Sequence, residues 1–163
     1  MISLRPLVLH DAPAVYQALD SSRDALRRWM GWYRDEYDLS DAEHWVRHTV
    51  ESAAAGSGFH FAIVDTADVI GVISLEDVGS GRAMLGYWMA SPVTGRGLGR
   101  QAIAQALTWA RRRRNIRTVW ALVADANVAS RRVLEINGFH RVGSRGTDER
   151  GDLQLVYELE LDR

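Results

Sequence analysis

Three glycines alternate along one short stretch of the chain, and two arginines accompany them: Gly95, Gly97 and Gly99, with Arg96 and Arg100. Glycine lets a ligand approach the backbone closely and permits positive φ angles. Arginine guanidinium groups pair with phosphate oxygens. The stretch therefore predicts a cradle for a pyrophosphate group, and the alternative is an ordinary loop with solvated arginines.

The elements on either side of this loop favour the cradle. An apolar run at 84–90 predicts a strand buried on both faces, and Ser91-Pro92 breaks it. Apolar residues at helical spacing then predict a helix from Leu98 to about Arg114. The first turn of a helix has N–H groups without an internal partner and a partial positive charge, so it can bind an anion.

A dinucleotide site is the second interpretation of the same residues. Residues 97–102 match G-x-G-x-x-A, and Asp125 follows the next predicted strand, 118–124. A dinucleotide-binding fold would continue with several βα units, but only one short helix and two strands remain. The preceding strands are connected by hairpins, which does not give an all-parallel sheet. The dinucleotide interpretation is therefore the weaker one.

Composition narrows the class of protein. The 163 residues include no cysteine, which excludes disulfides, thiolate metal sites and a cysteine nucleophile, and we expect no metal. The net charge of −1 gives no sign of nucleic-acid binding. No apolar run approaches the roughly 20 residues of a membrane span, and the N-terminus does not resemble a secretory signal. We expect a cytoplasmic protein with no nucleic-acid or membrane partner.

The remaining pattern predicts a single domain, residues 1–163. A first strand is expected at 2–6, and Asp11 is expected to cap the helix that follows. Ser40-Asp41-Ala42-Glu43 matches a capping box that begins another helix, ended by Gly56.

Strands are predicted on both sides of the glycine loop. Residues 59–64 and 69–75 form a hairpin, and a turn at 79–81 leads into a third antiparallel strand. His60 alternates within the first of these strands and is interpreted as structural. The elements expected after the long helix are a strand at 118–124, a short helix ended by Asn137-Gly138, a strand beginning at 139–142, a loop at 144–151 and an alternating strand at 153–161.

An aromatic-rich segment, 26–37, lies between the first two predicted helices. It carries Trp29, Trp32 and Tyr33 among charged residues. The segment is either a hydrophobic staple under a helix–helix connection or an apolar lid over a substrate.

Taken together, these features resemble the GNAT superfamily of N-acetyltransferases, and within it the RimJ/RimL-type branch of ribosomal-protein acetyltransferases. The resemblance covers the order of elements along essentially the whole chain. Its motifs are the strand with the glycine loop, the aromatic-rich segment, and Asp125-Ala126-Asn127-Val128-Ala129-Ser130 followed by Val133-Leu134-Glu135 and Gly138-Phe139.

The resemblance implies an α/β (α+β) fold. A mixed, mostly antiparallel central sheet would have a splay between two parallel strands and would be flanked by about four helices. Acetyl-CoA, as co-substrate, would lie in the splay. The backbone of 87–90 and Asn127 would bind its pantetheine arm, the loop would bind its pyrophosphate, and Ser130 would lie near the thioester. The cofactor-binding residues so implied are Trp88, Met89, Ala90, Gly95, Arg96, Gly97, Leu98, Gly99, Arg100, Asn127 and Ser130.

The sequence departs from the superfamily pattern at three places. Thr94 stands where the loop commonly opens with Gln or Arg, Leu134 where many members have a tyrosine general acid, and Met84 where many have a glutamate. Transfer to an amine needs a base and a donor for developing charge. Ser130 is the candidate donor and Glu76 the candidate base. Weaker candidates for the base are Asp77, Glu149 and Asp152.

The expected activity is transfer of an acetyl group to a primary amine. An α-amine has a pKa of about 8, against about 10.4 for lysine, so a weak base could suffice for it. We therefore expect a protein or peptide N-terminal α-amine as acceptor, such as a ribosomal-protein N-terminus. Trp29, Trp32 and Tyr33 would border it, and Asp35 and Glu36 would attract the ammonium group. The alternatives are a small-molecule amine, such as a polyamine or an antibiotic, and a non-catalytic acyl-CoA-binding module; a homodimer is left open.

Overall fold

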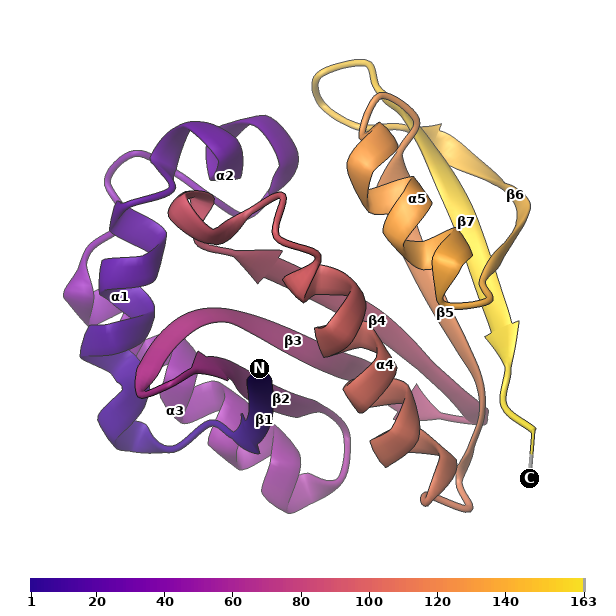
Figure 1. Ribbon diagram of the computed structural model, residues 1–163, viewed down its shortest axis with the longest axis horizontal. Coiled ribbons are helices and arrows are strands. Elements are labelled where there is room, and N and C mark those ends of the chain that lie inside the picture. The colour runs from indigo at the N-terminus through magenta and orange to yellow at the C-terminus, as the bar shows by residue number, and fades with distance from the viewer. Residues whose placement is uncertain (163) are drawn as a thin grey trace.

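The computed structural model describes residues 1–162; Arg163, the last residue of the predicted domain, lies outside them. The strands of that range form one mixed, seven-stranded sheet in the order β1-β2-β3-β4-β5-β7-β6 (Figure 1). Its strands are β1 (Ile2–Pro6), β2 (Phe59–Asp65), β3 (Asp68–Gly79), β4 (Gly81–Met89), β5 (Ile116–Ala124), β6 (His140–Thr147) and β7 (Leu153–Glu160).

Five α-helices occur in the described range, where the sequence predicted about four. The additional one is a seven-residue helix at the start of the aromatic-rich segment. None of the described helices is long and apolar enough to cross a membrane. The helices are α1 (Ala12–Asp20), α2 (Arg23–Trp29), α3 (Leu39–Ala55), α4 (Leu98–Arg111) and α5 (Val128–Ile136), with short 3-10 turns η1 (Leu9–Asp11) and η2 (Ser91–Val93).

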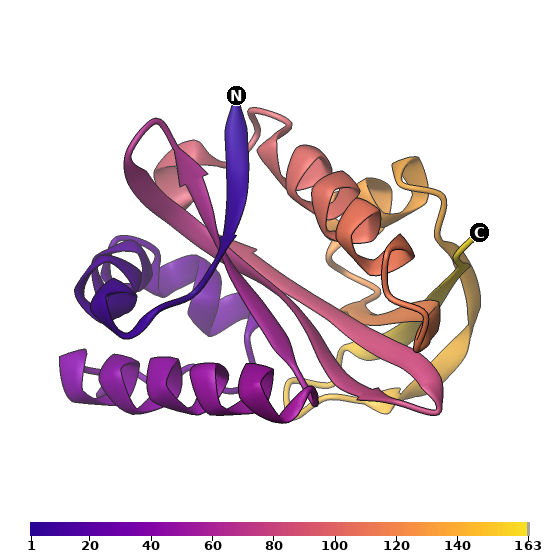
Figure 2. The ribbon, with the colours of Figure 1, turned by 90° about the horizontal axis from the view of Figure 1, so that it is seen from below.

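Helices cover both faces of the sheet (Figure 2). On one face α1 and α3 bury an apolar cluster that includes Val15, Val46 and Val72. On the opposite face α4 packs through Ile103 into a second cluster that includes Ile73. The sheet therefore separates the two clusters.

The parallel pair β4–β5 separates part-way along its length. Gly81 to Met84 pair with Ile116 to Trp120, after which β4 continues to Met89 beside β3 alone. Beyond Trp120, β5 continues beside β7. The predicted fold, a mostly antiparallel sheet with a splay between two parallel strands, is confirmed.

The start of α3 differs from the predicted capping box. The N-cap is Asp38, whose carboxylate accepts from the Asp41 N–H at 3.0 Å, while the Asp41 carboxylate accepts from the Asp38 N–H at 3.0 Å. The capping box predicted at Ser40 and Glu43 is therefore wrong. The Asp38 pair competes with it for the same role, and Asp41 also pairs with Arg34 at 2.6 Å, which favours the earlier start. The predicted end at Gly56 is confirmed.

Two strand predictions also change. The run 84–90 is not buried on both faces: Leu85 and Trp88 are buried, but Gly86 and Tyr87 are only partly covered, because the splay opens beside them. The predicted loop at 144–151 begins later, since β6 continues to Thr147 as a largely exposed edge strand. Its polar side chains hide the strand from a pattern search based on burial.

Candidate active site

The glycine loop leads from η2 into α4. Gly95 and Gly97 have φ angles of +80° and +73°, in the left-handed region that favours glycine, and nothing lies within 4 Å of a Cβ placed on either. Gly97 is the N-cap of α4. Gly99 differs: a Cβ there would lie 3.5 Å from the Tyr87 ring and 3.6 Å from the Met89 sulfur. Two glycines therefore shape an open backbone turn, and the third packs α4 against β4.

The other residues predicted beside the loop divide into exposed cations and buried side chains. Arg96 lies 3.6 Å from the Asp65 carboxylate, a loose ion pair, and Arg100 is exposed in the first turn of α4. The side chains of Trp88, Ala90 and Leu98 are buried in the core. On the side of the glycine loop they can therefore offer only backbone groups to a ligand.

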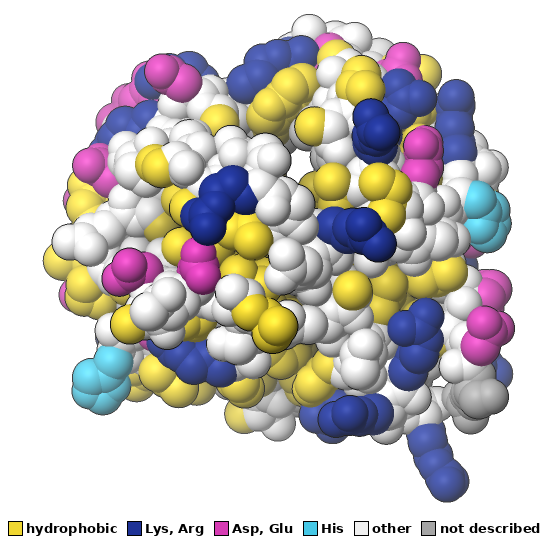
Figure 3. Space-filling model, in the orientation of Figure 1, with side chains coloured by type: hydrophobic (Ala, Val, Ile, Leu, Met, Phe, Trp, Pro, Cys, Tyr) yellow, Lys and Arg dark blue, Asp and Glu magenta, His cyan; other side chains and the backbone are white. Residues whose placement is uncertain are grey.

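A cavity of about 140 Å³ lies in the splay. Its walls come from 85–87 of β4, 121–124 of β5 and, on α5, Asn127 and Ser130. Figure 3 shows the molecule hollowed between the α2 side and the α5 side, with basic side chains beside the hollow. The splay is thus an accessible slot between the two halves of the sheet.

Asn127 and Ser130 occupy the first turn of α5. Asn127 is the N-cap, and its side-chain oxygen accepts from the Ser130 N–H at 3.2 Å. The residue also lines the splay cavity. The Ser130 hydroxyl accepts a hydrogen bond from the Tyr87 hydroxyl at 3.2 Å. Burial raises the pKa of Tyr87, with the hydrogen bond to Ser130 opposing the rise, so Tyr87 is a neutral donor at physiological pH.

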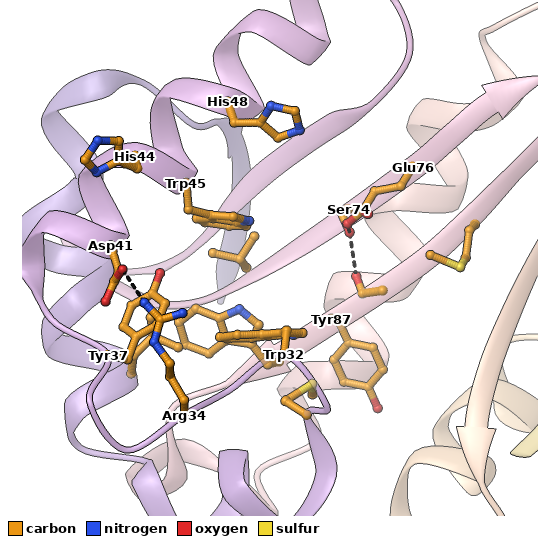
Figure 4. A pocket seen from close by; sticks show the side chains of 16 residues that line it. Trp32, Arg34, Tyr37, Asp41, His44, Trp45, His48, Ser74, Glu76 and Tyr87 are labelled. Carbon is orange, nitrogen blue, oxygen red and sulfur yellow. Dashed lines mark hydrogen bonds and ion pairs between the residues drawn. The ribbon is translucent and has the colours of Figure 1, made fainter. Parts of the chain in front are cut away.

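A larger cavity, of about 680 Å³, lies on the opposite face of the sheet from α4 (Figure 4). The residues 30–37, α3, β3 and β4 all contribute to it. Aromatic rings occupy its middle, with polar side chains toward both ends. The aromatic residues lining it are Trp32, Tyr37, Trp45, Tyr87 and Trp88, and the polar ones are Arg34, Asp41, His44, His48, Ser74 and Glu76.

Glu76 is held by two polar side chains. It lies on β3 opposite Met84 of β4, and its carboxylate accepts from the Ser74 hydroxyl at 2.7 Å. The His60 Nε2 atom lies 3.2 Å from the same oxygen, and His60 is held by an edge-on contact with Trp45. The hydrogen bond from His60, followed by that from Ser74, holds the pKa of Glu76 below its ordinary value despite partial burial. Glu76 is therefore ionised at neutral pH and is only weakly basic.

The aromatic residues predicted to border an acceptor occupy three different positions. Trp32 lies at the rim of the large cavity with half of its surface exposed. Trp29 lines the splay cavity instead. Tyr33 is buried in the core beside α1, and its hydroxyl accepts from Arg23 at 3.0 Å. Of the three, Trp32 is the one positioned to contact a molecule in the large cavity.

The acidic lining also differs from the sequence hypothesis. Asp35 pairs with Arg27 at 2.8 Å at the exposed surface. The carboxylates that line the large cavity are Asp41, which pairs with Arg34, and Glu76. The sequence hypothesis also missed the face of α3 that carries His44, Trp45 and His48. His48 lies four residues after His44 and three after Trp45, and this helical spacing was the available signal for a shared face.

The two cavities meet. Met30, Gly86 and Tyr87 line both of them. The junction has the Glu76 carboxylate on the side of the large cavity and the Ser130 hydroxyl on the side of the splay. This arrangement suits a group transfer between two molecules that enter from opposite faces of the sheet, with a base on one side and a hydrogen-bond donor on the other.

Known proteins share both the sequence pattern and the fold. Residues 2–140 match the family described as "Acetyltransferase (GNAT) domain". A relative, the probable N-acetyltransferase YjcK of Bacillus subtilis (strain 168), is 26% identical over an alignment of 148 residues, which covers 87% of this chain and 82% of YjcK.

Two solved structures extend the comparison. RimL, a ribosomal L7/L12 alpha-N-protein acetyltransferase in complex with coenzyme A, superimposes with a TM-score of 0.93 at 22% identity, over 99% of this chain and 94% of RimL. MccE, a microcin C7 self-immunity acetyltransferase in complex with acetyl-CoA and AMP, gives a TM-score of 0.90 at 19% identity, over 98% of this chain and 92% of MccE. The predicted likeness in fold to the RimJ/RimL branch is confirmed. Since the family match spans most of the chain, this protein belongs to the GNAT family of N-acetyltransferases.

Proposed function

We propose that this protein transfers the acetyl group of acetyl-CoA to the N-terminal α-amine of a peptide or protein. The observation that carries the proposal is the junction of the two cavities at Met30, Gly86 and Tyr87. An acyl donor in the splay and an amine in the large cavity would meet there.

The residues present fit acetyl-CoA. The open turn at Gly95 and Gly97 and the first turn of α4 offer backbone N–H groups to a pyrophosphate, with Arg96 and Arg100 nearby. The backbone of 88–90 and the Asn127 amide would hold the pantetheine arm along the splay. The coenzyme A or acetyl-CoA bound to RimL and MccE supports this assignment. When bound, acetyl-CoA would supply a thioester as the activated acetyl donor.

The side chains at the junction have complementary roles. An amine must lose a proton before it can attack a carbonyl carbon, and Glu76, ionised at neutral pH, would first hold the ammonium group electrostatically. It would then accept the proton directly or through water. The Ser130 hydroxyl, on the other side of the junction, would donate a hydrogen bond to the developing negative charge.

The weak basicity of Glu76 favours an α-amine over a lysine. An α-amine with a pKa of about 8 is already neutral in roughly a tenth of molecules at pH 7, whereas a lysine with a pKa of about 10.4 is almost entirely charged. The volume of about 680 Å³ is within the range of small-ligand pockets, and Trp32 at its rim offers apolar area to the first residues of a chain. RimL, which modifies a protein α-amine, supports the same acceptor class.

A panel of amines tests the proposal. Release of coenzyme A thiol can be followed with a thiol reagent without background from the protein, because the chain contains no cysteine. Peptides with a free N-terminus should give higher kcat/KM than N-terminally blocked lysine peptides, polyamines or aminoglycosides. Faster turnover of a polyamine or an antibiotic would establish a small-molecule acceptor instead. Binding of acetyl-CoA without turnover of any amine would indicate a non-catalytic binding module.

A further inference from the structure

Tyr87 links the two halves of the splayed sheet. It lies on β4, whereas the acceptor of its hydrogen bond, Ser130, lies on α5 beyond the opening. Below the splay the halves are joined by the β4–β5 ladder, but beyond Met84 that ladder has ended. The hydroxyl pair therefore spans the slot at the junction where the two cavities meet.

The Tyr87 ring is held in place before any ligand arrives. It packs against the core beneath α4, where its edge lies at van der Waals distance, 3.5 Å, from the position of a Cβ on Gly99. Burial keeps its hydroxyl protonated. A fixed ring with a permanent proton is a fixed hydrogen-bond donor.

The Ser130 hydroxyl, in contrast, is free to rotate. A serine hydroxyl carries one donor and two acceptor sites and rotates to suit its surroundings. Among residues 1–162, Tyr87 is the hydrogen-bond partner of the Ser130 hydroxyl. Because Tyr87 donates, the hydrogen of Ser130 must point elsewhere, and Ser130 itself lines the splay cavity.

We propose that Tyr87 is a positioning residue that fixes the Ser130 hydroxyl with its hydrogen directed into the splay, toward the sulfur of a bound thioester. The inference rests on the proposed function. Tyr87 keeps its own proton throughout: the amine proton goes to Glu76 or water, a C–N bond forms as the C–S bond breaks, and the electron pair left on sulfur accepts the hydrogen bond from Ser130.

A double-mutant cycle tests this role. Tyr87→Phe should lower kcat about fivefold to tenfold and change the KM for acetyl-CoA less than twofold, because one oriented hydrogen bond is lost while the ring remains. Ser130→Ala should lower kcat at least as much. Adding Tyr87→Phe to Ser130→Ala should then have no further effect. The matched control is Tyr157→Phe. It removes a buried tyrosine hydroxyl that donates at 2.9 Å to Glu135 of α5, the helix that also carries Ser130, and it should leave kcat within twofold.

A second readout does not depend on turnover. In protein labelled with 3-fluorotyrosine, the fluorine resonance of Tyr87 is identified by its loss in Tyr87→Phe. It should shift in Ser130→Ala, and it should shift more on addition of coenzyme A than on addition of desulfo-coenzyme A, which lacks the sulfur.

Three results would overturn the inference. They are an unchanged kcat in Tyr87→Phe, losses of kcat that multiply in the double variant, and a Tyr87 fluorine resonance that shifts neither in Ser130→Ala nor more with coenzyme A than with desulfo-coenzyme A. The cycle can be run with whichever amine the wild type acetylates. Acetylation of a different class of amine would therefore refute the proposed acceptor but not the role of Tyr87. The role of Tyr87 is refuted by the double-mutant cycle and the fluorine spectra alone.

Discussion

The two cavities that meet at Tyr87 are built in different ways. The splay depends on backbone: two strands separate after Met84, and two glycines with positive φ open the turn before α4. The large cavity depends on side chains brought together from 30–37, α3, β3 and β4. A site built from backbone requires glycine at fixed positions and can therefore be recognised as a sequence motif. A site built from side chains can be lined by many combinations of residues. We expect the two sites to respond to mutation separately.

The largest effect is expected from Gly97→Val. A β-branched residue at a φ of +73° is strained by at least the 1–2 kcal/mol or so of a left-handed conformation, and its side chain would cover the open turn. The dissociation constant of acetyl-CoA, measured by calorimetry, should rise by about tenfold to a hundredfold. Gly143→Val is the control, because Gly143 lies in the edge strand β6 with open space and an ordinary φ. Unchanged affinity in Gly97→Val would refute the cradle.

On the acceptor side, Glu76→Gln should lower kcat/KM for the amine about tenfold and leave acetyl-CoA affinity unchanged, because the ammonium group loses its counter-charge and its base. Steady-state kinetics and calorimetry on the same samples separate the two effects. Asp77→Asn removes the neighbouring carboxylate, which is exposed and has a φ of +50° that asparagine tolerates, and should leave both constants within twofold. Equal losses in the two variants would indicate a general charge effect and not a role for Glu76.

The pH dependence follows from the lowered pKa of Glu76. Since the folded-state pKa lies below the ordinary value of about 4.3, the stabilising contacts with His60 and Ser74 are fully present at higher pH and are lost as the pH falls through the folded pKa. Glu76 does not titrate between pH 6 and 9. A rise of kcat/KM across that range should therefore report the acceptor amine and persist in Glu76→Gln. Its disappearance in that variant would show that Glu76 itself titrates there.

Asn127 gives a smaller test on the splay side. Asn127→Asp keeps the side-chain oxygen that caps α5 but removes the NH₂ group of this cavity-lining residue. The KM for acetyl-CoA should rise severalfold while the melting temperature stays close to that of the wild type. Asn127→Ala removes both the oxygen and the NH₂ group, so the KM should rise and the melting temperature should fall. An aspartate variant with an unchanged KM would restrict Asn127 to capping the helix.

The smallest expected effect compares two tryptophans three positions apart. Trp32→Ala should lower kcat/KM for peptides about threefold to fivefold without changing acetyl-CoA affinity, because Trp32 lines the large cavity. Trp29→Ala should weaken acetyl-CoA affinity and leave kcat/KM for peptides unchanged, because Trp29 lines the splay cavity. The same pattern of change in both variants would break the separation between the two sites.

The features that the sequence predicts also differ between the backbone site and the side-chain site. The strand positions and the glycine turn were predictable because burial patterns and positive φ restrict residue type, whereas the splay was implied by the resemblance to the GNAT superfamily. The shift of the α3 cap to Asp38 was not, since two candidate capping pairs, Asp38 with Asp41 and Ser40 with Glu43, lie within six residues and the contact of Asp41 with Arg34 favours the first. Tyr33 was indistinguishable from Trp32 by composition, although one is buried in the core and the other lies at a cavity rim.

The polar partners at the junction were beyond sequence reasoning for a related reason. Glu76 was found as a carboxylate beside the central strand, but its contact with His60 joins residues 16 positions apart on neighbouring strands. The bond from Tyr87 to Ser130 spans 43 positions and crosses the opening of the sheet. Such pairs depend on register and splay angle, which no local pattern specifies.

The most direct test of the proposed transfer uses one peptide that offers two amines. A peptide with a free N-terminus and a single internal lysine is incubated with the protein and acetyl-CoA at pH 7, and fragment mass spectrometry locates the acetyl group during the first turnovers. We expect the acetyl group on the α-amine, in large excess over the lysine. Acetylation of the lysine, or none of the peptide while a polyamine is acetylated, would contradict an N-terminal acceptor.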